Sequence, residues 1–232
     1  MPQHIVAFGA HPDDIEFGCG AVLIKEIKKG NTVTMVDCSL GEAGTAGTAV
    51  IREREAKAAA RSIGAAIEFL DFGGDCHIAE TVLHRIKLAE RIRVLKPDII
   101  LAPTPDENQH PDHLAVSRLV RDASRLARYG GLKELKHLPP HVISALYYYA
   151  VTRFTSQQPD IIVDISEVMH EWRTMMSCHE TQVQNKSYLE LQETRSRFLG
   201  LSSGVEYAMG LWCNDPIAVD HLSLLDRGSR NF

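Results

Sequence analysis

Short apolar runs alternate with longer amphipathic segments along most of the chain, and this alternation constrains the fold more than any other feature. The first unit joins the apolar runs 4–8 and 32–37 through the segment 21–29, which ends in two lysines before Gly30. A basic last turn followed by glycine is typical of a helix C-terminus. The unit is therefore predicted to be a strand, a helix and a second strand.

The same pattern continues downstream. Strands are predicted at 67–70, 98–102, 145–151 and 160–165, and helices at 51–62, 81–95, 114–127, 167–177 and 187–198. Strands that are apolar throughout are typical of a parallel sheet covered on both faces. The predicted fold class is α/β, a Rossmann-like, doubly wound and mostly parallel sheet with helices on both faces. Because no stretch resembles a linker, residues 1–232 are predicted to form a single domain.

Composition excludes several classes of protein. The chain has 25 Lys and Arg against 30 Asp and Glu, a formal charge of -5, which argues against a nucleic-acid partner. No stretch approaches the roughly 20 apolar residues that span a bilayer, and the N-terminus does not resemble a signal peptide. We therefore expect a cytoplasmic protein without a membrane partner. Its five cysteines form no CxxC pair, which predicts reduced thiols rather than disulfides.

Two polar clusters follow predicted strands, at the sheet edge where open α/β folds bind ligands. Both combine imidazole with carboxylate around a proline: His11-Pro12-Asp13-Asp14 and His110-Pro111-Asp112-His113. Two histidines and one carboxylate form a divalent-metal site that leaves a position for water, as in catalytic zinc, and similar sets hold Fe(II). Such a metal lowers the pKa of its water to about 7 and polarises a carbonyl. The clusters therefore indicate amide hydrolysis.

The alternative is that these carboxylates cap helices, with Asp13 or Asp14 before one helix and Asp112 before another. Two such clusters in one crevice favour the metal site instead. The stretch Gly18-Cys19-Gly20 suggests a dinucleotide fingerprint, but Leu23 stands where that fingerprint needs glycine.

The motifs AHPDDIEFGCG and HPDH together resemble the PIG-L/LmbE family of metal-dependent N-acetylglucosaminyl deacetylases. The loop 41–48 is similar to the family's GE-x-G-x-x-GT pattern, and Arg52 with Glu55-Ala56 to its R-x-x-EA helix start. The segments 131–141 and 179–182 are most similar to the bacillithiol-pathway branch, whose substrate is N-acetylglucosaminyl malate. The chain departs from the family at Leu40, Ala21 and Met209, changes that we expect at the substrate rim.

The resemblance implies a role for each matched residue. His11, Asp14 and His113 would hold the metal, with zinc expected and Fe2+ or another divalent metal as the alternative. Asp13 would be the general base. His110, as an imidazolium, would stabilise the oxyanion, and Asp112 would orient His110.

The implied activity is zinc-dependent removal of the N-acetyl group from a small N-acetylglucosamine conjugate, with N-acetylglucosaminyl malate expected. The alternatives are hydrolysis of another N-acylated sugar or thiol conjugate, and metal or sugar binding without turnover. Arg52 is expected to bind an anionic substituent of the substrate, or else to be a solvated helix residue. His179 is a candidate for the pocket rim, and His77 for the surface. The resemblance also implies a homo-oligomer, a trimer or hexamer.

Overall fold

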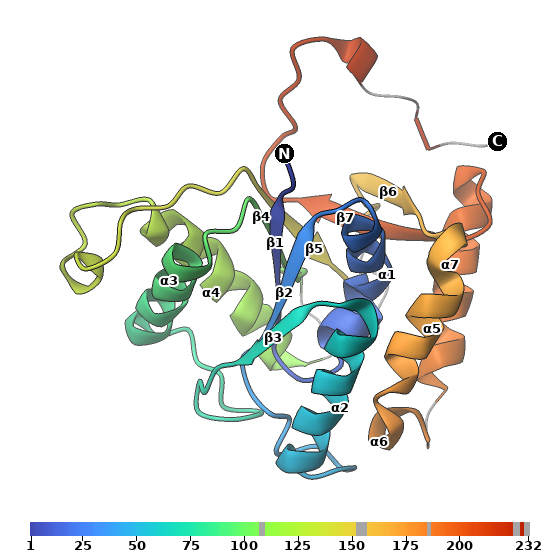
Figure 1. The fold of residues 1–232 in the computed structure, drawn as a ribbon, viewed down its shortest axis with the longest axis horizontal. Coiled ribbons are helices and arrows are strands. Elements are labelled where there is room, and N and C mark those ends of the chain that lie inside the picture. The colour runs from blue at the N-terminus through green and yellow to red at the C-terminus, as the bar shows by residue number, and fades with distance from the viewer. Residues whose placement is uncertain (107–109, 152–156, 185–186, 225–227, 230–232) are drawn as a thin grey trace.

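The computed structural model describes residues 1–106, 110–151, 157–184, 187–224 and 228–229, and its centre is a seven-stranded sheet (Figure 1). The strand order is β3-β2-β1-β4-β5-β7-β6. The strands are β1 (His4–Gly9), β2 (Thr32–Asp37), β3 (Ala66–Phe69), β4 (Ile99–Pro103), β5 (Ala145–Tyr149), β6 (Ile161–Asp164) and β7 (Ala208–Cys213). The first five strands run parallel to one another, and β7 runs antiparallel to both of its neighbours.

Helices cover both faces of the sheet, as predicted (Figure 1). They are α1 (Asp14–Lys28), α2 (Ala49–Ile63), α3 (Val82–Leu95), α4 (Pro111–Ala127), α5 (Met169–Ser177), α6 (Glu180–Val183) and α7 (Tyr188–Ser203). Helix α5 packs against α1 and α2, whereas α3 packs against α4. One core forms around Trp172 and Phe17, and the other around Phe8 and Leu119. The predicted doubly wound α/β fold is thus confirmed.

The sequence prediction missed β7 and began α1 too late. The strand β7 contains Gly210, which breaks the apolar run at the point where Pro159 packs against the backbone. Gly18 and Gly20 lie inside α1, where large side chains contact the helix directly. A Cβ at Gly18 would lie 2.2 Å from the Tyr149 ring. These glycines therefore allow close packing and do not form a phosphate-binding loop.

The strand order places the two polar clusters next to each other. Strands β1 and β4 are neighbours, and the loops after them carry the His11 and His110 clusters at the same edge of the sheet. The loops after β2 and β3 reach the same edge. Within the described ranges, no helix combines the length and apolarity needed to cross a bilayer.

Candidate metal centre and active site

The Asp14 carboxylate lies between His11, which follows β1, and His113, which lies in the first turn of α4. Its Oδ1 is 2.9 Å from His113 Nε2, and its Oδ2 is 3.5 Å from His11 Nδ1. The same Oδ2 accepts hydrogen bonds from the backbone N–H groups of Ala10 and His11. These bonds fix the turn after β1, so the three expected ligands come together, with one donor atom from each lying within 4.8 Å of the others.

These residues fit a divalent metal by their charge and by their donor atoms. Three carboxylates face the His11 ring, with Asp75 Oδ1 at 3.0 Å and Asp112 Oδ2 at 3.3 Å in addition to Asp14. Burial lowers the pKa of His11, but hydrogen bonds to these carboxylates outweigh burial and raise that pKa well above its ordinary value. His113 Nδ1 is buried and has no hydrogen-bond partner in the described part of the chain. A divalent cation neutralises the buried negative charge of these carboxylates. Zn2+ and Fe2+ both accept two histidines and one carboxylate as ligands.

Asp13 has an unfavourable backbone conformation that a simple structural role does not require. Its φ of 110° lies in the left-handed region, and its side chain makes no cap hydrogen bond to α1. The carboxylate is 14% exposed and lies 3.3 Å from Arg52 Nη2. Burial raises its pKa to about 6, although Arg52 opposes the shift. Strain of this kind concentrates at functional positions, so the helix-cap alternative is not supported for Asp13.

His110 is the N-cap of α4, because its Nδ1 accepts a hydrogen bond from the Asp112 N–H at 3.2 Å. The ring proton is therefore on Nε2. Burial and the neighbouring His11 lower the pKa of His110, which favours a neutral imidazole over the expected imidazolium. The ring is about one third exposed, with a side-chain accessibility of 31%, so Nε2–H is available as a donor.

The Asp112 carboxylate lies closer to His11 than to His110. Its Oδ2 is 3.3 Å from His11 Nε2 and 3.9 Å from His110 Nδ1. It also accepts a 2.8 Å hydrogen bond from the Cys76 N–H. The expectation that Asp112 orients the His110 ring through its side chain thus differs from the structure, where the Asp112 backbone makes that contact.

Arg52 is buried and its guanidinium donates to the protein itself. Nη1 donates to the Gly41 carbonyl at 3.0 Å, and Nη2 donates to the Pro12 carbonyl at 2.7 Å. Gly41 has a φ of +66°, and a Cβ there would lie 1.8 Å from Nη1. Arg52 therefore joins the loop after β2 to the turn that carries Asp13. In this structure Arg52 is buried rather than solvated, and its Nε has no hydrogen-bond partner among the described residues.

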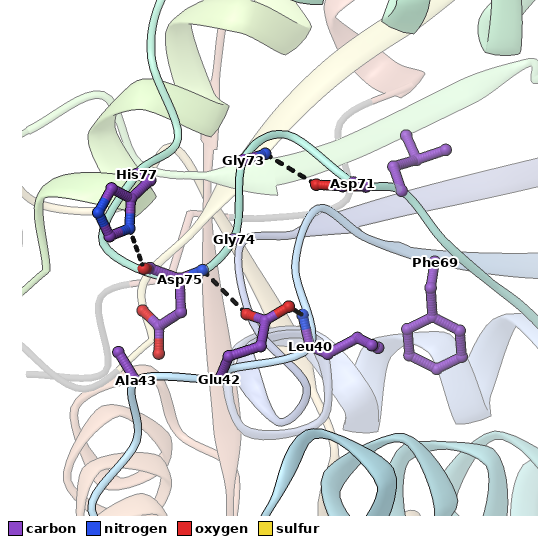
Figure 2. A pocket seen from close by; sticks show the side chains of 10 residues that line it. Leu40, Glu42, Ala43, Phe69, Asp71, Gly73, Gly74, Asp75 and His77 are labelled. Carbon is purple, nitrogen blue, oxygen red and sulfur yellow. Dashed lines mark hydrogen bonds between the residues drawn. The ribbon is translucent and has the colours of Figure 1, made fainter.

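Asp75 is a site residue that the sequence reasoning missed. It lies in the loop between β3 and α3, and its contact with His11 lowers the pKa of its carboxyl. Figure 2 shows how Glu42 fixes this loop, because the Glu42 carboxylate accepts hydrogen bonds from the N–H groups of both Leu40 and Asp75. A signal was present, since Asp71 and Asp75 follow a predicted strand, but no histidine precedes them as in the other clusters.

A pocket of about 710 Å³ begins at Asp75 and lies between the loops after β2 and β3 (Figure 2). Three carboxylates line it, from Glu42, Asp71 and Asp75, together with the apolar Leu40 and Phe69. Among the described residues that line it there is no lysine or arginine. Its volume suits a small ligand of sugar-conjugate size. The lining itself is acidic, and Lys87 Nζ lies beside it, donating to the Asp71 carbonyl at 2.8 Å.

The remaining candidates are placed as follows. Leu40 lines this pocket, and His77 lines it too while being exposed at the surface as expected. Met209 lies in β7 opposite Val163 and lines a different cavity from the pocket beside Asp75. His179 is fully buried and pairs with Glu16 at 2.8 Å rather than lining a rim.

Comparisons with known proteins agree with this geometry. The family model described as GlcNAc-PI de-N-acetylase (PIG-L) matches residues 6–124. Diacetylchitobiose deacetylase of Thermococcus kodakarensis is 30% identical, covering 90% of this chain and 82% of that protein. A probable N-acetyl-alpha-D-glucosaminyl L-malate deacetylase of Bacillus cereus is 25% identical, covering 79% of this chain and 86% of that protein.

A solved structure shows a similar fold. The conserved protein TT1542 from Thermus thermophilus superposes with a TM-score of 0.85 at 30% identity, covering 94% of this chain and 97% of that one. The resemblance found in the motifs thus extends to the whole sheet and its helices.

Proposed function

The chain belongs to the PIG-L family of de-N-acetylases, and from that premise we propose that it hydrolyses the N-acetyl group of a neutral N-acetylglucosamine conjugate. The observation that carries the proposal is the buried His11, Asp14 and His113 set beside the strained Asp13. His11, Asp14 and His113 would hold the zinc, which would supply an activated water and polarise the acetyl carbonyl. We therefore propose a zinc-dependent N-deacetylase.

The protein's own residues transfer the proton, stabilise the charge that develops on the substrate and position the base. Asp13 takes a proton from the attacking water and delivers it to the leaving amine nitrogen. In the metal-free protein, burial raises the pKa of this carboxyl. The Nε2–H of neutral His110 donates a hydrogen bond to the carbonyl oxygen as negative charge develops there. Arg52 is a positioning residue, because it holds the turn that carries Asp13.

The charge of the adjacent pocket supports a neutral aglycone over malate. A malate conjugate carries two carboxylates, and they would enter a pocket lined by Glu42, Asp71 and Asp75. Arg52, the arginine identified from sequence, donates from both Nη atoms to backbone carbonyls. A second neutral sugar, as in diacetylchitobiose, meets no such repulsion. N-acetylglucosaminyl malate remains the alternative substrate that the test below includes.

The test is an assay of primary-amine release on diacetylchitobiose, N-acetylglucosamine and N-acetylglucosaminyl malate, with metal-stripped and zinc-restored protein. We expect zinc-dependent release, and a kcat/KM for diacetylchitobiose at least about tenfold above that for the malate conjugate. Tenfold corresponds to about 1.4 kcal/mol, an ordinary charge repulsion near a protein surface. Absence of amine release from all three substrates would contradict deacetylation of N-acetylglucosamine conjugates. A preference for the malate conjugate would contradict the neutral aglycone.

A charge-neutral variant provides the matched control for the pocket. Asp71 Oδ1 accepts a hydrogen bond from the Gly73 N–H at 2.9 Å, and asparagine retains that acceptor. Asp71→Asn should therefore raise kcat/KM for the malate conjugate while leaving that for diacetylchitobiose unchanged. An equal change on both substrates would show that the pocket charge does not select the aglycone.

A further inference from the structure

A second group of metal-binding donors lies beside the His11, Asp14 and His113 set and shares no residue with it. It consists of Asp75 Oδ1, Cys76 Sγ and His110 Nε2. The sulfur lies 3.4 Å from the Asp75 oxygen and 3.6 Å from the His110 nitrogen, and the oxygen and nitrogen lie 3.6 Å apart. The three atoms thus form a nearly equilateral triangle.

This triangle has the dimensions of one face of a tetrahedral zinc site. Zinc bonds of about 2.3 Å to sulfur and about 2.0 Å to nitrogen and oxygen, at tetrahedral angles, place these donors about 3.3–3.6 Å apart. The observed separations lie within about 0.3 Å of these values. A metal ion above the triangle therefore needs little change in the spacing of the three donor atoms.

The loop that carries two of the donors is held in place by hydrogen bonds. Cys76 has a left-handed φ of 67°, and its N–H donates to Asp112. The Asp75 N–H donates to Glu42, and His77 Nδ1 bonds to the Asp75 carbonyl at 2.8 Å (Figure 2). Cys76 is exposed, so an ion can reach the donors from solvent.

We propose that Asp75, Cys76 and His110 form a second site for a thiophilic divalent metal such as Zn2+, and that occupation of this site inhibits the enzyme. Binding replaces the Cys76 S–H bond by a sulfur–metal bond and releases the proton to solvent. His110 binds through Nε2 as the tautomer with its proton on Nδ1, so the N-cap hydrogen bond that Nδ1 accepts from the Asp112 N–H is given up. The Asp112 carboxylate, 3.9 Å from Nδ1, takes over as the partner of Nδ1 when the ring turns towards it, as carboxylates commonly do behind a metal-bound histidine.

The inhibition follows from the use of His110 and rests on the proposed function. With its Nε2 lone pair bound to a metal, His110 no longer has the N–H that donates to the carbonyl oxygen. The metal also occupies the side of Asp75 where the pocket meets the catalytic centre. Metal binding at the second site does not itself depend on what the enzyme hydrolyses.

The test titrates Cd2+ into the zinc-loaded protein and follows the ultraviolet charge-transfer absorption of a cadmium–thiolate bond. Cys76→Ser removes the sulfur and keeps a small polar side chain. Cys213→Ser is the matched control, because Cys213 is a partly exposed thiol at the end of β7. We expect the band in the wild type and in Cys213→Ser, and its loss in Cys76→Ser. No band in the wild type, or an undiminished band in Cys76→Ser, would overturn the site.

A second measurement tests the inhibition. Excess Zn2+ should inhibit amine release by the wild type, and Cys76→Ser should need at least about 10-fold to 100-fold more Zn2+, since even an outer-shell partner of a metal contributes that much affinity. Equal inhibition of both proteins would overturn the inhibitory role. If no protein releases amine while the cadmium band still requires Cys76, the proposed function fails and the second metal site stands.

Discussion

Replacing Asp13 by asparagine should separate proton transfer from metal binding, because Asp13 lies beside the metal ligands without belonging to them. Asparagine has the same shape as aspartate and tolerates the left-handed backbone at this position. It cannot accept a proton from water. Asp14→Asn is the matched comparison, since Asp14 contacts both His11 and His113.

The expected loss of turnover follows from the contribution of a positioned general base. Asp13→Asn should lower kcat by roughly 10²-fold to 10⁴-fold, which is about 3–5 kcal/mol in the activation barrier. Its metal content should stay at that of the wild type. Asp14→Asn should lose metal and turnover together, because one of three ligands is weakened.

The same substitution should stabilise the metal-free protein. Burial raises the pKa of Asp13 from 3.8 to about 6, and a shift of about two units corresponds to about 3 kcal/mol. Because the pKa in the folded state is the higher one, ionisation of Asp13 disfavours folding, fully so above about pH 6. Asp13→Asn should therefore raise the free energy of unfolding by up to about 3 kcal/mol near pH 8. The gain should shrink as the pH falls from about 6 towards 4.

Three measurements decide the matter: bound metal by mass spectrometry, kcat by amine release, and the free energy of unfolding by urea denaturation of chelator-treated protein. If Asp13→Asn loses its metal while Asp14→Asn keeps it, ligand and base have been interchanged. If neither variant slows turnover, the site is wrong. A loss of stability in Asp13→Asn near pH 8 would refute the argument from the buried carboxylate.

Three further predictions concern the metal and the loop after β2. A chelator should abolish amine release, and about one equivalent of Zn2+ per chain should restore it; full activity of metal-free protein would contradict the mechanism. Arg52→Lys should lower kcat/KM equally for neutral and anionic conjugates, because lysine cannot serve both the Gly41 and Pro12 carbonyls; a selective loss on the malate conjugate would instead show direct anion binding. Gly41→Ala should lower the free energy of unfolding by more than Gly64→Ala in urea denaturation, because both positions are left-handed but only Gly41 contacts Arg52; equal effects would mean that this contact contributes nothing.

Much of the fold was predictable because the relevant signals are local. The strands β1 and β4 are apolar runs bounded by polar turns, and a histidine and aspartate cluster comes almost directly after β1 and within seven residues of the end of β4. The rule that ligands bind beyond the carboxyl ends of parallel strands then brings the two clusters together. The approach of Asp14 to His113 at 2.9 Å agrees with that expectation.

Contacts between distant loops were not predictable in the same way. The Arg52 side chain reaches Pro12 across 40 positions of sequence, and His11 meets Asp75 across 64. Nothing in the local pattern states where a long side chain will find its acceptors. The strand β7 was missed for a related reason, since its pairing with β5 and β6 is a property of the assembled sheet.

Separate loops carry the metal ligands and the adjacent pocket, yet the two parts are mechanically joined. The expected metal ligands come from the loop after β1 and the first turns of α1 and α4, whereas the loops after β2 and β3 form the pocket. Arg52 ties the loop after β2 to the turn of Asp13, and Asp75 ties the loop after β3 to His11. A change that shifts either pocket loop therefore also displaces a residue beside the metal. Substrate preference should consequently be easiest to alter through Asp71, which lines the pocket without holding either connection.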